Sequence, residues 1–350
     1  MTEKTFSPVL VTGATGYIAS WIVKKLLERG FTVHGTVRNL NDLQKIEHLL
    51  QLRAEYPGRL MLFEADLMKE ESFDEAMEGC EIVIHTASPF FVQHIKDPDK
   101  QLIQPAQLGT RNVLLTANQH PTVKKVVLTS SVAAIYGDAA DALGMKDLTF
   151  NETHWNKTSS PVHQPYSYSK TVAEQEAWKI AGEQVRWKLV VINPSFVLGP
   201  ALGNQSDSTS NSILKQIVSG KLRTGVPMFW YGIVDVRDVA EAHILAALNE
   251  DAEGRHILAS GHGSFLDIAN IIRKHFGEGY PLPRREMPKW LILLLGPAFG
   301  ISRKMVKANA NIRFYLDNSK SREKLGISYI PVEQTIREHF EQMGNEAMRQ

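Results

Sequence analysis

The stretch from Val9 to Ala19 constrains the fold more than any other part of the chain. It begins with three apolar, mostly β-branched residues, as in a strand buried in a parallel sheet. Gly13 then permits a sharp turn, because glycine takes positive φ freely. Gly16 leaves room for a pyrophosphate at the start of the following helix, where free N–H groups and the helix dipole hold phosphates. Ala19 stands where such fingerprints usually have a third glycine, and a plain strand–helix turn is the alternative interpretation.

Strands alternate with helices six times over about 190 residues, which predicts an α/β fold: a Rossmann-type, doubly wound parallel sheet with helices on both faces. We expect residues 1–200 to form a dinucleotide-binding Rossmann domain, with 232–250 returning to it. Residues 201–231 and 251–350 are expected to form mainly a smaller C-terminal, substrate-binding lobe. The strands are expected at 9–11, 31–37, 60–64, 82–85, 125–128 and 189–192.

The bulk composition excludes several classes of function. The formal net charge of the 350 residues is +1, which gives no strong field for nucleic acid or an anionic membrane. The single cysteine, Cys80, suits a cytoplasmic protein, and the polar N-terminus has no signal-peptide core. The apolar stretch 290–300 is shorter than the about 20 residues that span a bilayer. We favour a buried or lobe-covering helix there, with a weak interfacial contact as the alternative.

The residue after the second strand indicates which dinucleotide binds. Arg38 lies where an acidic residue would bind the 2′-hydroxyl of NAD, whereas arginine accommodates the 2′-phosphate of NADP. Lys45 can add a second positive charge, and a solvated loop charge is the alternative for Arg38. Asp66 either caps the next helix or hydrogen-bonds the adenine. We expect His85 to be a packed residue at a strand end rather than a catalytic base.

The catalytic chemistry is predicted from three residues. Tyr166 and Lys170 are four residues apart and therefore lie on one face of a helix. The ammonium near the phenol is expected to lower the tyrosine pKa from its ordinary value of about 10. Such a phenol is a general acid for a carbonyl oxygen that receives hydride. Ser131, at the carboxyl end of a strand, supplies a hydroxyl that polarises this oxygen. Tyr168 faces another side of the helix and is expected to be structural.

Several sequence motifs together resemble the extended short-chain dehydrogenase/reductases, and most of all the branch that contains dihydroflavonol reductases, cinnamoyl-CoA reductases and aldehyde or ketone reductases. They are Thr12-Gly-Ala-Thr-Gly-Tyr-Ile18, Val37-Arg38, Ala65-Asp-Leu67, His85-Thr-Ala-Ser-Pro89, Thr129-Ser-Ser131, Tyr166-x-x-x-Lys170, Asn193-Pro-Ser-Phe-Val-Leu-Gly-Pro200 and Val234-Asp-Val-Arg-Asp-Val-Ala240. The resemblance implies NADPH as cofactor and Ser131, Tyr166 and Lys170 as the catalytic set. The cofactor-binding residues are then Gly13, Thr15, Gly16, Tyr17, Ile18, Arg38, Lys45, Asp66, Leu67, Thr86, Ala87, Tyr166, Lys170, Pro194 and Val197.

One departure from the family concerns the substrate. In plant dihydroflavonol reductases an asparagine five residues after the catalytic serine binds the ring hydroxyls of the flavonoid. In this chain that position is Tyr136. This argues against a dihydroflavonol but not against an aldehyde or a ketone, including an aryl ketone. We expect Phe90, Phe91 and Tyr136 to line an apolar substrate pocket, and we expect no metal.

The predicted function is therefore NADPH-dependent reduction of a small-molecule carbonyl, or oxidation of the corresponding alcohol, by a monomer or homodimer. Three alternatives stay open: a nucleotide-sugar epimerase or dehydratase, a 3β-hydroxysteroid-type dehydrogenase, and a non-catalytic NADP sensor. The first two share the expected fold and catalytic residues, so the sequence separates them only through the cofactor and the substrate.

Overall fold

The computed structural model of the chain describes residues 7–88, 97–203 and 209–347. Its centre is a seven-stranded sheet in which every neighbouring pair is parallel, in the order β10-β7-β5-β4-β1-β2-β3. This confirms the predicted α/β, Rossmann-type fold. The strands are β1 (Val9–Thr12), β2 (Val33–Val37), β3 (Leu60–Glu64), β4 (Ile82–His85), β5 (Lys125–Thr129), β7 (Lys188–Pro194) and β10 (Gly254–Leu258).

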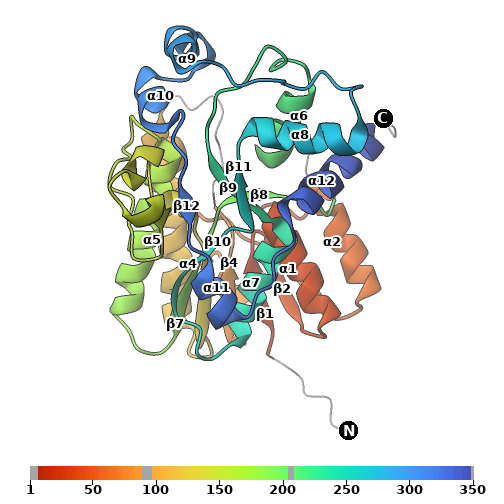
Figure 1. Ribbon diagram of the computed structural model, residues 1–350. Coiled ribbons are helices and arrows are strands. Elements are labelled where there is room, and N and C mark those ends of the chain that lie inside the picture. The colour runs from red at the N-terminus through yellow and green to blue at the C-terminus, as the bar shows by residue number, and fades with distance from the viewer. Residues whose placement is uncertain (1–6, 89–96, 204–208, 348–350) are drawn as a thin grey trace.

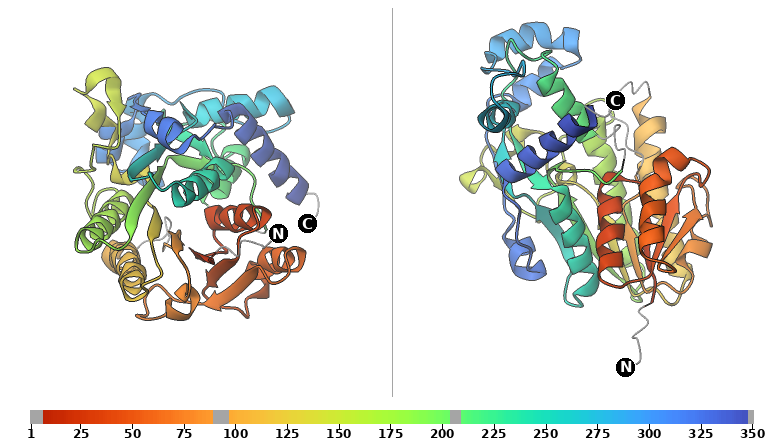
Figure 2. Two further views of the ribbon diagram at one scale, coloured as in Figure 1. Left: turned by 90° about the horizontal axis from the view of Figure 1, so that it is seen from below. Right: turned by 90° about the vertical axis from the view of Figure 1, so that its right-hand side faces the viewer.

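Helices cover both faces of this sheet, as Figures 1 and 2 show. Side chains alternate along each strand, so Val9 and Val11 of β1 pack with one set of helices and Leu10 packs with the other. The first set is α1 (Tyr17–Glu28), α2 (Leu43–Glu55) and α7 (Val236–Leu248). The second set is α3 (Asp74–Met77), α4 (Gln104–Gln119) and α5 (Pro165–Gly182). The expected layers are therefore present on both faces.

Strand β10 was not foreseen, because residues 251–350 were assigned mainly to the lobe. It pairs with β7 along its whole length, from Gly254 opposite Val190 to Leu258 opposite Pro194. Its sequence places two polar residues, Arg255 and His256, in the middle of the strand. Both are buried, so the usual apolar signal of a central strand is missing there.

The strand order reverses between β1 and β4. From β1 the chain moves outward to β2 and β3, then returns to β4 and continues in the opposite direction. Parallel sheets bind ligands beyond the carboxyl ends of their strands at such a switch point. A binding site is therefore expected at the residues that follow β1 and β4.

The C-terminal lobe lies beyond the carboxyl edge of the central sheet, at the top of Figure 1. Its core packs a three-stranded sheet, in the order β11-β9-β8, against three helices. These elements are β8 (Phe196–Leu198), β9 (Tyr231–Asp235), β11 (Gly261–Gly263), α6 (Thr209–Val218), α8 (Phe265–Phe276) and α12 (Val332–Ala347). A separate small core joins α9 (Lys289–Leu295) to α10 (Arg303–Asn309).

Shorter elements complete the chain. A π-helical turn, Asp99–Ile103, leads into α4, and Pro105 in the first turn of α4 lacks an N–H for regular helical bonding. A two-stranded parallel ladder joins β6 (Thr149–Phe150) to β12 (Tyr315–Leu316), and α11 (Ser319–Leu325) follows. Across the described residues, no helix combines the length and the apolar character that crossing a bilayer requires.

Candidate active site

The loop between β1 and α1 has the geometry of a phosphate cradle. Gly13 has φ +66°, and its backbone N–H donates to the Thr36 hydroxyl of β2 at 3.1 Å. A Cβ atom on Gly13 would lie 3.0 Å from the Ala87 Cβ. Gly16 is the N-cap of α1, whose first turn has neither a side-chain cap nor an acidic residue. The N-terminal N–H groups of α1 are thus left for an anion, which fits the diphosphate of a dinucleotide.

Ala19, the departure from the usual third glycine, is accommodated in the core. It is 1% exposed and belongs to the cluster that packs α1 against β1. The extra methyl group therefore leaves the loop intact.

The segment after β4 is tied to the end of β1. The Thr12 hydroxyl accepts hydrogen bonds from the backbone N–H groups of Thr86 and Ala87, each at 3.1 Å. It also lies 2.8 Å from Nδ1 of His85. His85 is 1% exposed, and burial, aided by the Lys170 charge, lowers its pKa to about 3. A neutral, enclosed imidazole confirms the expectation that His85 is packed at the strand end.

The residues predicted for the adenosine end lie on the β2 side of the loop. Arg38 directly follows β2 and is exposed. Lys45, in the first turn of α2, is 64% exposed and its ammonium lies 3.5 Å from the Asp42 carboxylate. Among the described residues no acidic side chain forms an ion pair with Arg38. Both cations therefore remain accessible to a 2′-phosphate.

Asp66 and Leu67 have structural contacts of their own. Oδ1 of Asp66 accepts from the Met68 N–H at 2.9 Å, so the carboxylate stabilises the turn after β3. Asp66 does not cap the next helix, because α3 begins at Asp74 and its N-cap is Phe73. Leu67 packs closely over Gly109 of α4, and its carbonyl accepts from Asn112 at 2.8 Å.

Four other predicted cofactor residues lie around the same edge. Tyr17 points its hydroxyl away from the loop, to the Gly199 carbonyl at 2.5 Å, so only its backbone faces the cradle. Ile18 packs against the α1 core, Pro194 ends β7, and Val197 lies in β8 opposite Val234 of β9.

Ser131 and Tyr166 meet at the carboxyl end of β5. Ser131 begins a 3₁₀ helix (Val132–Ala134), and its hydroxyl accepts from the Ala133 N–H at 3.1 Å. Tyr166 lies in the first turn of α5 and is hydrogen-bonded to the Ser131 side chain. Burial raises the pKa of Tyr166 to about 12, against a smaller lowering by that hydrogen bond. The predicted lowering by Lys170 is therefore wrong for this structure, because desolvation of the phenolate outweighs any nearby charge.

Lys170 connects this pair to the glycine loop. It is 8% exposed, one turn after Tyr166, and its ammonium donates to the Ser88 hydroxyl at 3.2 Å. Ser88 follows Ala87, which packs against Gly13. Burial lowers the pKa of Lys170 to about 8, with Glu174 opposing the shift. The structure thus brings together the predicted catalytic residues and the predicted phosphate loop.

A buried network under the site was missed in the sequence. The Glu174 carboxylate, one turn beyond Lys170, accepts from Ser130 at 2.5 Å and from Asn193 at 2.8 Å. Nε of Arg255, on β10, lies 2.6 Å from its other oxygen. Asn193 also donates to the Ser131 carbonyl at 3.1 Å. The only sequence signal was an acidic residue on the same helix face as Tyr166 and Lys170.

A second network, also missed, anchors the start of α5. The buried Asp138 carboxylate lies 2.7 Å from Nε2 of His163 and accepts from Gln164 at 2.9 Å and from Asn309 at 2.7 Å. Gln164 has φ +55°, which is uncommon for a residue other than glycine, and it stands two residues before Tyr166. These bonds hold the turn that presents the phenol.

The predicted substrate residues are only partly described. Phe90 and Phe91 lie outside the described residues. Tyr136 stacks on Phe150 with ring centroids 4.8 Å apart, and it tilts against Phe314 at 4.7 Å. Burial raises its pKa, and the neighbouring Tyr231 adds to that shift.

Comparison with known proteins agrees with this geometry. The family model described as "NAD dependent epimerase/dehydratase family" matches residues 9–259, and the chain belongs to that family. A cinnamoyl-CoA reductase of Medicago truncatula is 36% identical over 337 residues, which cover 96% of this chain and 95% of the relative. A dihydroflavonol 4-reductase of Gerbera hybrida is 34% identical over 80% of this chain and 75% of its own length. These relatives confirm the resemblance found in the sequence.

Solved structures of two reductases also resemble this chain. Gre2 from Candida albicans, in complex with NADPH, is 34% identical, with a TM-score of 0.80 over 97% of this chain and 99% of that one. Yeast methylglyoxal/isovaleraldehyde reductase Gre2, also with NADPH, is 28% identical with a TM-score of 0.76.

Proposed function

We propose that the chain is an NADPH-dependent reductase of aldehyde or ketone carbonyls. The observation that carries the proposal is the hydrogen bond between the half-buried Ser131 and Tyr166, joined through Lys170, Ser88 and Ala87 to the glycine loop. One contiguous site therefore offers an anion cradle and a proton donor. The relatives named above, which include reductases solved with NADPH, support the same function.

The residues divide the chemistry as follows. Bound NADPH would supply the hydride. Tyr166 is protonated at neutral pH, since the ordinary tyrosine pKa already lies well above 7 and burial raises it further, to about 12, so its hydroxyl can give a proton to the carbonyl oxygen. Ser131 donates a hydrogen bond that orients the same oxygen and stabilises its developing charge. Lys170, one turn away, would hold the ribose of the bound cofactor, and its ammonium would return a proton to the phenolate that the transfer leaves.

The aromatic residues near Tyr136 favour an apolar carbonyl compound as the substrate. Tyr136, five residues after Ser131, lies near Tyr231, and Tyr231 stacks on Phe265 with centroids 5.2 Å apart. Phe196 of β8 tilts against Tyr231 at 6.0 Å. This aromatic surface suits aryl or branched aliphatic groups better than a sugar diphosphate, which needs cations. We place the protein in a reducing compartment such as the cytoplasm, where Cys80, buried and unpaired, would remain a thiol.

An absorbance assay of NADPH oxidation, over aldehydes, α-diketones, β-ketoesters and aryl ketones, tests the proposal. We expect turnover with NADPH and at least about tenfold lower kcat/KM with NADH. Arg38→Ser should lower kcat/KM for NADPH by about 10- to 100-fold and leave that for NADH nearly unchanged, because a charge-assisted contact to the 2′-phosphate is lost. Arg53→Ser, on the exposed side of α2, is the matched control.

Two outcomes would favour the alternatives. Purification with tightly held NAD and no carbonyl turnover would indicate an epimerase or dehydratase. NADPH binding without turnover of any carbonyl would indicate a sensor. Equal use of both cofactors by the unmodified protein would overturn the role given to Arg38.

The pKa of Lys170 predicts an alkaline limit to activity. The ammonium is present below its pKa of about 8 and is lost above it, so kcat/KM for reduction should be level up to that pH and then fall. Lys170→Arg should remove this alkaline limb, because a guanidinium stays charged there, although the rate itself will be lower. Lys179→Arg, on the same helix, should retain the limb. An unchanged limb in Lys170→Arg would assign the titration to another group.

A further inference from the structure

The tip formed by α9 and α10 has an apolar outer face. Ile292 of α9 is buried against Val306 of α10 in a small core. On the opposite side, Trp290 is 67% exposed, Leu294 is 62% exposed and Leu295 is 41% exposed. The sequence favoured a buried helix here, but only its inner face is buried. A seven-residue helix packed against a single small core has no second layer to cover its outer face.

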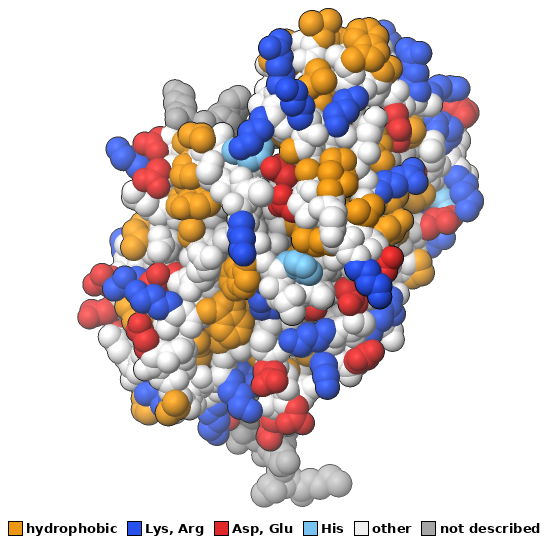
Figure 3. Space-filling view, turned by 60° about the vertical axis from the view of Figure 1, so that its left-hand side comes forward, with side chains coloured by type: hydrophobic (Ala, Val, Ile, Leu, Met, Phe, Trp, Pro, Cys, Tyr) orange, Lys and Arg blue, Asp and Glu red, His pale blue; other side chains and the backbone are white. Residues whose placement is uncertain are grey.

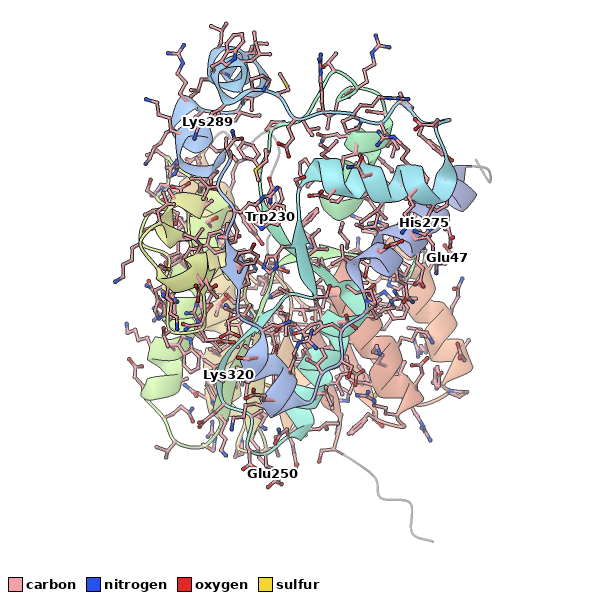
Figure 4. All side chains as sticks on the ribbon, viewed as in Figure 1. Glu47, Trp230, Glu250, His275, Lys289 and Lys320 are labelled. Atoms are coloured by element: carbon pink, nitrogen blue, oxygen red, sulfur yellow. The ribbon has the colours of Figure 1, made fainter. Side chains whose placement is uncertain are left out.

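Basic side chains surround this apolar face. Residues 289–309, which form the tip, contain four lysines and arginines and no acidic residue, a net charge of +4 in a chain whose total is +1. The exposed basic residues of α10 are Arg303, Lys304 and Lys307. In the described part of the chain, no acidic side chain pairs with any of these three. Figure 3 shows hydrophobic and basic side chains together at the top of the molecule, and Figure 4 places Lys289 at the base of the tip.

The tip is also an extremity of the molecule. In Figure 1 and in the right-hand view of Figure 2, α9 stands at the top of the lobe. It can therefore meet a broad flat surface without the rest of the chain intervening.

We propose that the α9–α10 tip docks the protein peripherally on an anionic lipid bilayer. The exposed tryptophan and leucines would enter the interfacial region, which favours such amphipathic groups. The surrounding lysines and arginines would face the acidic headgroups, each contributing to binding as basic residues near such a surface do. This inference concerns a surface outside the proposed active site and does not depend on the proposed reaction.

Charge decides between this partner and a second copy of the chain. A two-fold interface would place the same patch on both subunits and so bring two surfaces of net charge +4 together. Such like-charge contact disfavours association. An anionic surface has the opposite sign and is complementary to the tip.

Flotation of the full chain with lipid vesicles tests the proposal. We expect binding to vesicles of phosphatidylcholine mixed with phosphatidylserine, little binding to phosphatidylcholine alone, and loss of binding at high salt. Leu294→Ser and Lys304→Glu should each weaken binding by about tenfold. The matched controls are Leu43→Ser, where the leucine is 64% exposed on α2, and Lys179→Glu on α5. All four positions lie outside the predicted catalytic and cofactor-binding residues, and thermal unfolding verifies that each variant is folded.

The proposal would be overturned if phosphatidylserine vesicles did not bind the chain, or if the control variants weakened binding as much as the tip variants. A concentration-dependent dimer dissolved by Leu294→Ser would instead assign the face to a second copy. Binding to an acidic protein, with no binding to vesicles, would assign it to a protein partner.

Discussion

Tyr166→Phe is expected to lower kcat for carbonyl reduction by about 100- to 10,000-fold, the range typical of a lost general acid. The substitution removes only the hydroxyl that is hydrogen-bonded to Ser131 and leaves the half-buried ring in the same space. Binding of NADPH should be retained, because the glycine loop and the exposed cations beside it are untouched. Steady-state reduction of the best carbonyl of the panel measures the first effect, and calorimetric titration with NADPH measures the second.

Tyr168→Phe supplies a close control, since it makes the same change two residues later on the same helix. Tyr168 faces another side of α5, so its loss should change kcat less than about twofold if general acid catalysis belongs to Tyr166. Near-normal turnover in Tyr166→Phe would refute the assignment. If the variant lost both turnover and NADPH binding, the cause would be damaged folding. The unfolding curve of the variant tests for that damage.

The cofactor half of the site could be predicted because its contacts are local in sequence. A strand, a glycine turn and a helix follow one another within Val9–Ala19, so composition and spacing alone describe the cradle. Tyr166 and Lys170 share one helix, and Ser131 lies two residues after the end of strand β5. For the glycine loop and for Tyr166 with Lys170, the secondary structure alone fixes which residues lie together, and the contact with Ser131 follows from the usual placement of sites at the carboxyl ends of parallel strands.

The remaining features depend on contacts between distant segments. Glu174 and Arg255 are 81 residues apart, and only the placement of β10 beside β7 brings them together. Asp138 likewise meets Asn309 across 171 residues. The pKa of Tyr166 was predicted in the wrong direction for a related reason. A helical spacing reveals the neighbouring charge, whereas desolvation depends on everything packed around the phenol.

Glu174→Ala is expected to lower the free energy of unfolding by about 3–5 kcal/mol, which is the cost typical of removing one partner of a buried ion pair. Glu174 is 1% exposed and Arg255 is 6% exposed, so the guanidinium would be left in the interior without its counter-charge. Arg255 cannot simply turn to solvent, because it also donates to the backbone carbonyl of His154 at 2.5 Å and stacks on Trp155 at 4.0 Å. Urea unfolding at neutral pH measures the change.

Glu81→Ala separates the effect of burial from that of charge pairing. Glu81 and Lys124 also form a close ion pair, at 2.8 Å, but their side chains are 42% and 68% exposed. Water solvates either charge when the other is removed, so this variant should lose at most about 1 kcal/mol. Equal losses in the two variants would contradict the argument that Glu174 is a buried counter-charge. A large loss confined to Glu174→Ala would instead establish that the Glu174–Arg255 ion pair beneath Lys170 holds β10 and α5 together. Local sequence patterns do not reveal this contact.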